Sequence, residues 1–168
     1  MSYPARPQNG GGNWNGIMKA WNTIVAALMF AAAMGFAPAN AAGTPEQAQA
    51  LAEKAAVLVK AEGDKAFATL SDSNGGYVQG DLYVTVIDRQ GVVHANINQK
   101  VIGVNMWEAK DPDGVLFTQE LWKVVASSET GWTRYKYVNP TTKKIEPKKA
   151  WVHKVGDYVV LCGAYVND

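Results

Sequence analysis

The chain has 168 residues, a formal net charge of +1 and 48% hydrophobic residues. This length suits one modest domain with its own core. The near-zero charge argues against nucleic-acid binding, because neutralising phosphates requires a dense basic face. Lysines do cluster in VNPTTKKIEPKKAWV, residues 138–152, but Glu146 interrupts them. The cluster therefore suggests a solvated turn or the positive wall of a small-anion site.

The amino-terminal part of the chain has the features of an export signal. Lys19 precedes an apolar run over residues 24–36, and Ala39-Asn40-Ala41 has the small-x-small pattern of a cleavage site. The run is shorter than the ~20 apolar residues that span a bilayer. A secretory signal peptide is the prediction that follows.

We assign this signal peptide to residues 18–41, so that the mature chain begins at Ala42 in the periplasm or outside the cell. An uncleaved membrane anchor is the alternative. Residues 1–17 are rich in Gly and Asn and show no periodicity. They are predicted to be disordered, or an upstream extension if translation starts at Met18.

A long helix is predicted from Thr44 to Leu70. Thr44-Pro45-Glu46-Gln47 supplies an N-cap, a proline at the first helical position and early acceptors. Apolar residues then recur at helical spacing. Gly63-Asp64 predicts an interruption, and the Ser/Asn/Gly-rich segment 71–76 ends the helix.

After this helix the hydrophobic period changes to two, which is typical of strands. An irregular segment with a strong turn at 111–114 and an amphipathic helix separates the second strand from the third. The order predicts one α+β domain with an antiparallel sheet of five strands, a long N-terminal helix and a short crossover helix. The predicted strands are 81–88, 92–95, 131–138, 149–155 and 158–166, and the crossover helix is 116–127.

Four stretches carry a family resemblance: GDLYVTVIDRQGVVHAN, VIGVNMWEAKDPDGVLFTQEL, GWTRYKYVNPTTKKIEPKKAWV and GDYVVLCGAYV. In this order and spacing they resemble the single Cache domain of type 2, over about residues 50–166. This family is an extracytoplasmic relative of the PAS fold, found in bacterial chemoreceptors and sensor kinases. The resemblance implies that residues 42–168 form one PAS-like domain with a small-ligand pocket between the sheet and the crossover segment.

The same resemblance implies a function. Ligands of such domains are mostly short organic acids and other small metabolites, so we expect an extracytoplasmic sensor domain. No transmembrane helix or signalling module follows it in this sequence, and a membrane receptor, kinase or transporter is the expected partner. One alternative is a PAS-like interaction or structural module without an open pocket, present as a homodimer. Another is a periplasmic haem or metal protein that uses His94.

Within the lysine cluster, Lys148 and Lys149 stand at the start of a predicted strand, where successive side chains face opposite sides. One of them should therefore face the pocket. By the family's pattern this is Lys148, as the partner of a ligand carboxylate; the alternative places both lysines at the surface. Lys143 and Lys144 are expected to point into water.

Aromatic residues on neighbouring strands and on the crossover complete the predicted pocket. Tyrosine hydroxyls are suitable donors, and tryptophan and methionine side chains are suitable apolar walls or lids. A plain hydrophobic core is the alternative, and Tyr83 is a weaker candidate. The predicted ligand-binding residues are Lys148, Tyr135, Tyr137, Trp132, Met106, Trp107 and Trp151.

Other chemistry finds little support in the sequence. His94 and His153 are the only histidines and lie on different strands, which is a thin basis for a metal or haem site. Asp111 and Asp113 indicate a turn rather than a calcium loop. Cys162 lies in an apolar strand pattern and is expected to be a buried, inert thiol. We therefore expect no enzyme, no cofactor and no metal.

Overall fold

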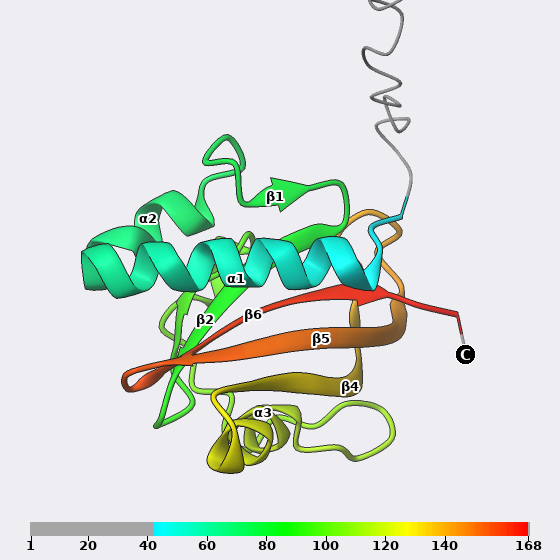
Figure 1. Ribbon diagram of the computed structural model, residues 1–168. Helices are drawn as coiled ribbons and strands as arrows, with labels where there is room; N and C mark the ends of the chain where they lie inside the picture. Colours follow the sequence, from blue (N-terminus) through cyan, green and yellow to red (C-terminus); the bar gives the residue numbers. More distant parts are fainter. Residues whose placement is uncertain (1–41, 168) are drawn as a thin grey trace, which may run out of the picture. The chain divides into compact units, whose positions relative to one another are not determined.

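The computed structural model describes residues 42–167. The predictions for residues 1–41, including the signal peptide and its cleavage, lie outside the described residues. Figure 1 shows an antiparallel sheet with helices packed against it. The elements are α1 (Pro45–Glu62), α2 (Ala66–Ser71), α3 (Phe117–Ser127), β1 (Val78–Gln79), β2 (Leu82–Asp88), β3 (Val93–Ala95), β4 (Thr130–Val138), β5 (Ile145–Val155) and β6 (Tyr158–Tyr165).

The predicted long helix is present and begins with a capping box. The Thr44 side chain accepts a hydrogen bond from the backbone N–H of Gln47, and the Gln47 side chain accepts one from the backbone N–H of Thr44. These bonds satisfy two donors that a helix start leaves unpaired. Helix α1 ends at Glu62. Its C-cap Gly63 has a φ of 58°, and a short 3-10 turn leads from there into α2. The predicted interruption is confirmed.

The sheet has the strand order β1-β2-β6-β5-β4, and β3 pairs with β2. The α+β class, the long N-terminal helix and the antiparallel sheet are confirmed. The sheet has six strands rather than five, because the two-residue strand β1 also pairs with β2. Strand β5 begins at Ile145 instead of residue 149, so the prediction missed its first four residues.

Two hydrophobic layers cover the two faces of the sheet, as β6 illustrates. Val160, Cys162 and Ala164 pack in the layer that contains α1, whereas Val159 and Leu161 pack in the layer that contains α3. This alternation is the period of two expected of a strand covered on both sides. Burial raises the pKa of the Cys162 thiol to about 11, which fits the prediction of an inert thiol.

The crossover between β3 and α3 is fastened to the β2–β3 hairpin. Met106 donates its backbone N–H to the carbonyl of Gly91 at 2.7 Å, and Gly103 donates to the carbonyl of Val93 at 2.8 Å. Gly91 has a φ of 88°, and a Cβ placed there would lie 2.8 Å from the Cβ of Trp107. A side chain at this position would therefore push the crossover away from the sheet.

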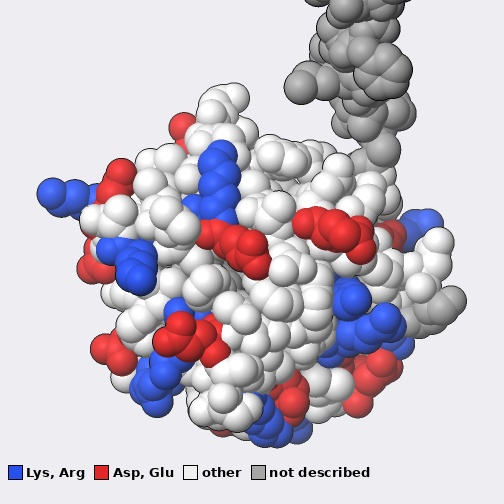
Figure 2. All heavy atoms as spheres, in the orientation of Figure 1, with Lys and Arg blue, Asp and Glu red and all other residues white. Residues whose placement is uncertain are grey.

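The surface over α1 carries both signs of charge. Figure 2 shows lysine, arginine, aspartate and glutamate interspersed on this face rather than separated into areas of one sign. Within residues 42–167, no helix has the length and apolarity needed to cross a membrane.

Candidate functional site

A small cavity lies between the sheet and the crossover segment, on the face opposite α1. Its volume is about 20 Å³, which is room for roughly one or two water molecules. The wall is mostly apolar, and Met106 and Phe117 belong to it. The polar side chains that line the cavity are Tyr83, Thr85, Asn96, Tyr135 and Tyr137.

Lys148 of β5 reaches the tyrosine rings beside this cavity because Gly163 on the neighbouring strand has no side chain in its path. In the sheet register Lys148 lies opposite Tyr135 of β4 and Tyr165 of β6. A Cβ added at Gly163 would lie 2.7 Å from Cε and 2.9 Å from Cγ of Lys148. The lysine stem therefore passes over Gly163 of β6 and places its ammonium beside Tyr83 of β2.

The Lys148 ammonium is enclosed by tyrosine rings. Its Nζ lies 3.8 Å from the ring centroid of Tyr83, 4.8 Å from that of Tyr165 and 6.0 Å from that of Tyr137. Cation–π attraction in such geometry is worth ~0.5–2 kcal/mol. The residue is only 3% exposed, and within residues 42–167 no oxygen accepts a hydrogen bond from Nζ. The site thus holds a nearly buried lysine whose ammonium is contacted by aromatic rings.

Tyr135, Tyr137 and Tyr165 remain protonated, so their phenols do not neutralise this cation. Burial raises the pKa of Tyr137 to about 12, with a smaller contribution from Tyr83. Burial also raises the pKa of Tyr135 and of Tyr165 well above the ordinary tyrosine value. Tyr165 donates its hydroxyl hydrogen to the carbonyl of Val138 at 2.6 Å, and its oxygen lies 3.4 Å from the Tyr83 hydroxyl.

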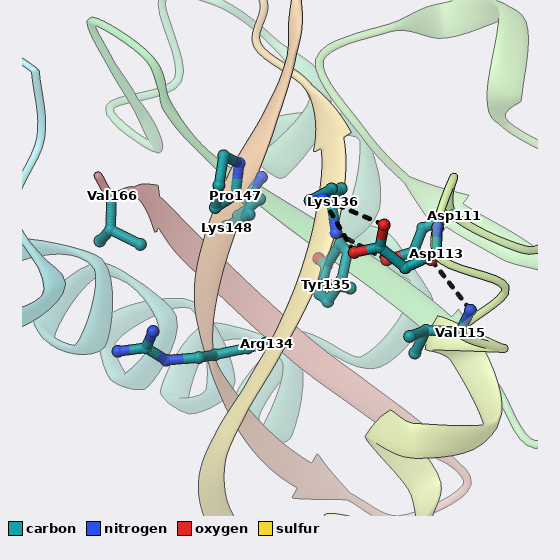
Figure 3. Close-up of a pocket in the computed structure, with 9 residues that line it drawn as sticks. All are labelled: Asp111, Asp113, Val115, Arg134, Tyr135, Lys136, Pro147, Lys148 and Val166. Atoms are coloured by element: carbon teal, nitrogen blue, oxygen red, sulfur yellow. Dashed lines mark hydrogen bonds and ion pairs between the residues drawn. The ribbon is translucent and has the colours of Figure 1, made fainter. Parts of the chain in front are cut away.

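A second space, an outer cleft of about 190 Å³, opens beside the cavity at the edge strand β4. Tyr135 lines both spaces, and Lys148 lines the cleft while its ammonium contacts the rings of the inner cavity. Figure 3 shows the cleft, with Pro147 and Lys148 on one strand and Asp111 and Asp113 facing Lys136 of β4. Tyr135 and Lys148 thus form the boundary between the two spaces.

The acidic side chains at this cleft are already engaged. One Asp111 oxygen accepts from the backbone N–H of Asp113 and Val115, and the other accepts from Lys136 N–H at 2.9 Å. Asp113 pairs with the Lys136 ammonium at 2.9 Å. Burial alone would raise the pKa of Asp111, but the three backbone hydrogen bonds outweigh it, so the pKa is lowered. The predicted turn at 111–114 is therefore tied to β4.

The predicted ligand-binding residues divide between the two faces of the sheet. Lys148, Tyr135, Tyr137 and Met106 meet around the cavity and cleft. The other three do not line these spaces. Trp132 and Trp151 pack against each other on the face of α1, with ring centroids 5.0 Å apart and Lys149 over Trp132, and Trp107 packs against Gly91.

Several residues of the site were missed from sequence. Tyr165 and Gly163 lie in the terminal strand, which reads as plain core, and Tyr83 was the weakest candidate. Strand alternation places each on one face or the other, but only the register of three strands brings them to Lys148. Lys143 and Lys144 are exposed, as predicted.

The two histidines considered as metal or haem ligands lie away from the cavity. Within residues 42–167 no group of three or more His, Cys, Asp or Glu side chains could hold a metal ion. His94 lies 2.8 Å from Asp88 and His153 is on another strand. Neither histidine lines the cavity.

Replacing Gly163 by alanine tests how Lys148 is placed. The new methyl group would overlap the Lys148 stem, so we expect a loss of about 1–3 kcal/mol of stability, as is usual for overpacking. Thermal unfolding of Gly163→Ala measures this loss. In a Lys148→Ala background, which removes the overlapping methylenes, the same change should cost clearly less. Equal costs in both backgrounds would contradict the placement.

Several solved structures share this fold, and two of them are described as parts of chemotaxis proteins. A methyl-accepting chemotaxis protein from Vibrio parahaemolyticus matches with a TM-score of 0.64 at 20% identity, over 73% of this chain and 88% of that one. A periplasmic sensor domain of a chemotaxis protein matches with a TM-score of 0.58 at 23% identity, over 73% and 90%. A structure described as the basis for carboxylic acid recognition by a Cache chemosensory domain matches with a TM-score of 0.60 at 21% identity. The match covers 73% of this chain and 92% of that one.

At these identities the likeness concerns the fold. The search of curated proteins found no match. The family model of single Cache domain 2, however, matches residues 39–168. Since this match covers most of the chain and all of the described domain, the chain belongs to the single Cache domain 2 family.

Proposed function

We propose that this chain is an extracytoplasmic sensor domain that binds a small carboxylate at Lys148. The observation that supports it most directly is a lysine ammonium that is 3% exposed and has no oxygen partner within residues 42–167. Lysines are almost never fully buried unless they are paired. A bound carboxylate would supply the missing partner.

The free energy of such a contact is substantial. Hydrogen bonds to charged groups contribute ~1.5–3 kcal/mol, and a site that excludes water strengthens the ion pair further. Cation–π contacts from Tyr83 and Tyr165 compensate the ammonium only in part. In the ligand-free protein the Lys148 ammonium therefore remains available to bind an anion.

The cavity also restricts the class of acid. None of the described residues that line the inner cavity is acidic, so the ammonium of an amino acid would find no counter-charge there. The cavity is small and largely apolar, which favours a short monocarboxylate. Binding requires Tyr135 or Met106 to move, because about 20 Å³ does not hold even a short acid.

The family and the sequence support a proposal for the cellular context. We propose export through the predicted signal peptide and cooperation with a membrane receptor, kinase or transporter. The solved chemotaxis domains with this fold support that role. Their sensing role also supports the expectation that this chain is not an enzyme.

A thermal-shift screen tests the proposal. Short monocarboxylates, dicarboxylates, amino acids and amines would each be added to the purified protein. A ligand at about a hundred times its dissociation constant should stabilise the folded state by about 2.7 kcal/mol. We expect this with at least one short monocarboxylate and not with amines. Failure of every acid at millimolar concentration would count against a carboxylate sensor.

The smallness of the cavity favours one second candidate, a PAS-like interaction module that functions as a homodimer without a ligand. In that case no compound of the screen would stabilise the protein. Sedimentation measurements would then show a dimer whose dissociation constant is unchanged by replacing Lys148.

A further inference from the structure

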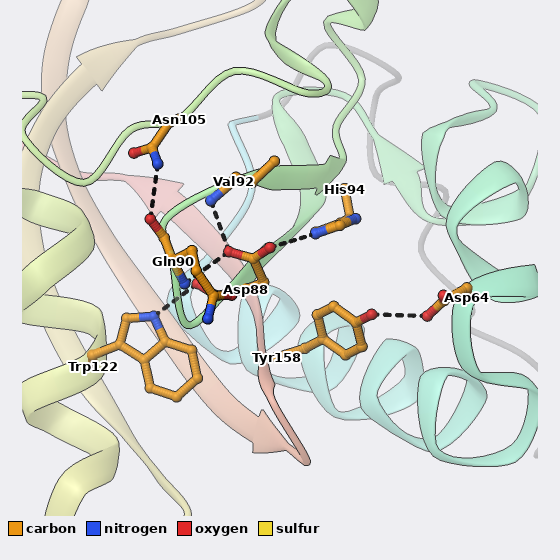
Figure 4. Close-up of polar contacts among 8 residues, drawn as sticks. All are labelled: Asp64, Asp88, Gln90, Val92, His94, Asn105, Trp122 and Tyr158. Carbon is orange, nitrogen blue, oxygen red and sulfur yellow. Dashed lines mark hydrogen bonds and ion pairs between the residues drawn. The ribbon is translucent and has the colours of Figure 1, made fainter.

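A second cluster of polar contacts lies at the β2–β3 hairpin, outside the ligand site. The Asp88 carboxylate accepts from the backbone N–H groups of Gln90 and Val92 with one oxygen and contacts His94 Nε2 with the other, at 2.8 Å. Figure 4 shows Asp88 at the centre of these contacts, with Trp122 of α3 donating to its backbone carbonyl at 3.2 Å. Asp88 thus joins the hairpin turn to α3.

The same hairpin turn holds the part of the crossover that encloses the cavity. Asn105 donates its side-chain amide to the carbonyl of Gln90 at 2.9 Å, and Met106 donates its backbone N–H to the carbonyl of Gly91 at 2.7 Å. Met106 also lines the inner cavity. A movement of Asp88 would therefore reach the cavity wall through the hairpin turn and its hydrogen bonds to the crossover.

His94 contacts this path directly, through Asp88. Its ring packs against Phe67 of α2 and Tyr158 of β6, with centroid distances of 5.4 and 5.3 Å. The side chain is 31% exposed, so protons reach it, and Asp88 is 16% exposed. Histidine is the side chain that ordinarily changes charge between pH 5 and 8. A charge-assisted hydrogen bond is roughly twice as strong as a neutral one.

Other ionisable groups face His94 from the surrounding elements. Tyr158 donates its hydroxyl to Asp64 at 2.9 Å, which raises the pKa of the phenol and keeps it neutral. The acidic and basic groups nearby are Asp88 on β2, Asp64 in the 3-10 turn, Asp72 after α2, and Asp157 and Arg89, which pair with each other in the two hairpin turns. Of these, Asp88 is the group in contact with the imidazole.

We propose that Asp88 and His94 are positioning residues that make the ligand site sensitive to pH: protonated His94 strengthens the Asp88 contact, steadies the hairpin turn and holds Met106 against the cavity. The predicted effect on ligand affinity rests on the proposed function. The predicted coupling of His94 protonation to the position of Met106 does not. The proposal places the pH response outside the cavity, in a pair that touches no ligand.

Met106 is the only methionine in residues 42–168, so its methyl group is a suitable NMR probe. In full-length protein with labelled methionine methyls, a Met106→Leu variant assigns the signal. We expect this signal to shift between pH 5 and 8 with the midpoint of the His94 ring, which is followed directly in the same sample. The shift should vanish in His94→Gln and persist in His153→Gln, the matched control at the only other histidine.

The proposal would be overturned if the Met106 chemical shift did not change with pH in the unmodified protein. It would also be overturned if the shift changed with pH in His94→Gln as it does in the parent. The comparison of the two midpoints in unmodified protein decides the matter even if a variant fails to fold.

Acetate serves as the probe for the effect on binding. Because protonated His94 holds Met106 in the position that a ligand must displace, the dissociation constant should be about fivefold or more higher at pH 6 than at pH 8, within the usual range of coupling between sites. His94→Gln should abolish the difference. Equal acetate affinities at both pH values, with a titrating Met106, would refute the link to affinity. If acetate binds at neither pH, the proposed function fails for this acid while the Met106 titration still decides the positioning role.

Discussion

Replacing Lys148 by methionine is expected to weaken the binding of a short carboxylate by about ten- to a hundredfold, which corresponds to ~1.5–3 kcal/mol. Methionine keeps most of the stem over Gly163 and removes the ammonium. The tyrosine rings that face Nζ remain in place, so the loss reports the charge rather than a collapse of the site. Calorimetry with the acid found by the thermal-shift screen measures the effect.

Two neighbouring lysines provide the controls. Lys149 follows directly but faces Trp132 on the other side of the sheet, and Lys143 is exposed in the turn. Lys149→Met and Lys143→Met should bind the acid as the parent does. The ligand-free Lys148→Met protein should also unfold at a higher temperature than the parent, because an unpaired buried charge is costly. A variant with unchanged affinity would show that the carboxylate is not held by Lys148.

Replacing Asp111 by alanine is expected to destabilise the domain by about 3 kcal/mol. Three backbone N–H groups lose a charged acceptor, and each such bond contributes ~1.5–3 kcal/mol, with water recovering part of the loss. Urea unfolding monitored by tryptophan fluorescence gives the free energy of unfolding. Asp113→Ala removes only the half-exposed ion pair to Lys136 and should cost less than about 1 kcal/mol.

The pH dependence of the Asp111 contribution has a definite sign. Because the folded-state pKa of Asp111 is lowered, its stabilising contribution is complete above the unfolded-state pKa of about 3.9. It is lost as the pH falls through the lower, folded-state pKa. The stability difference between parent and Asp111→Ala should therefore shrink in acid and stay constant from pH 5 upward. A difference that grows on acidification would rule out this role.

Much of the fold was predictable because local signals agree with the tertiary structure. The capping box of Thr44 and the period-two strands needed no knowledge of packing. The start of β5 was not predictable, since Pro147 lacks the N–H of a strand residue and argues against a strand there. In the structure Pro147 is tolerated near the strand end, where its carbonyl still accepts from Val166 N–H.

The candidate site was predictable only within one strand. Alternation correctly puts Tyr135 and Tyr137 on one face, and the same rule puts Trp132 on the other, because an odd number of positions separates it from both. Counting positions along the strand would have shown that Trp132 and the two tyrosines lie on opposite faces. The approach of Lys148 to Tyr83 depends on the pairing of β5, β6 and β2, and a single sequence does not contain that register.

The passage of the Lys148 stem over Gly163 has a consequence for the thermodynamics of binding. A lysine side chain loses up to ~1.5–2 kcal/mol of rotamer freedom when it is immobilised, and here that loss occurs during folding. A ligand therefore meets an ammonium that is already in position, and association does not include the ordering of this side chain. Binding should accordingly show a smaller entropic penalty than carboxylate capture by a surface lysine, and Gly163 is the residue that makes this possible.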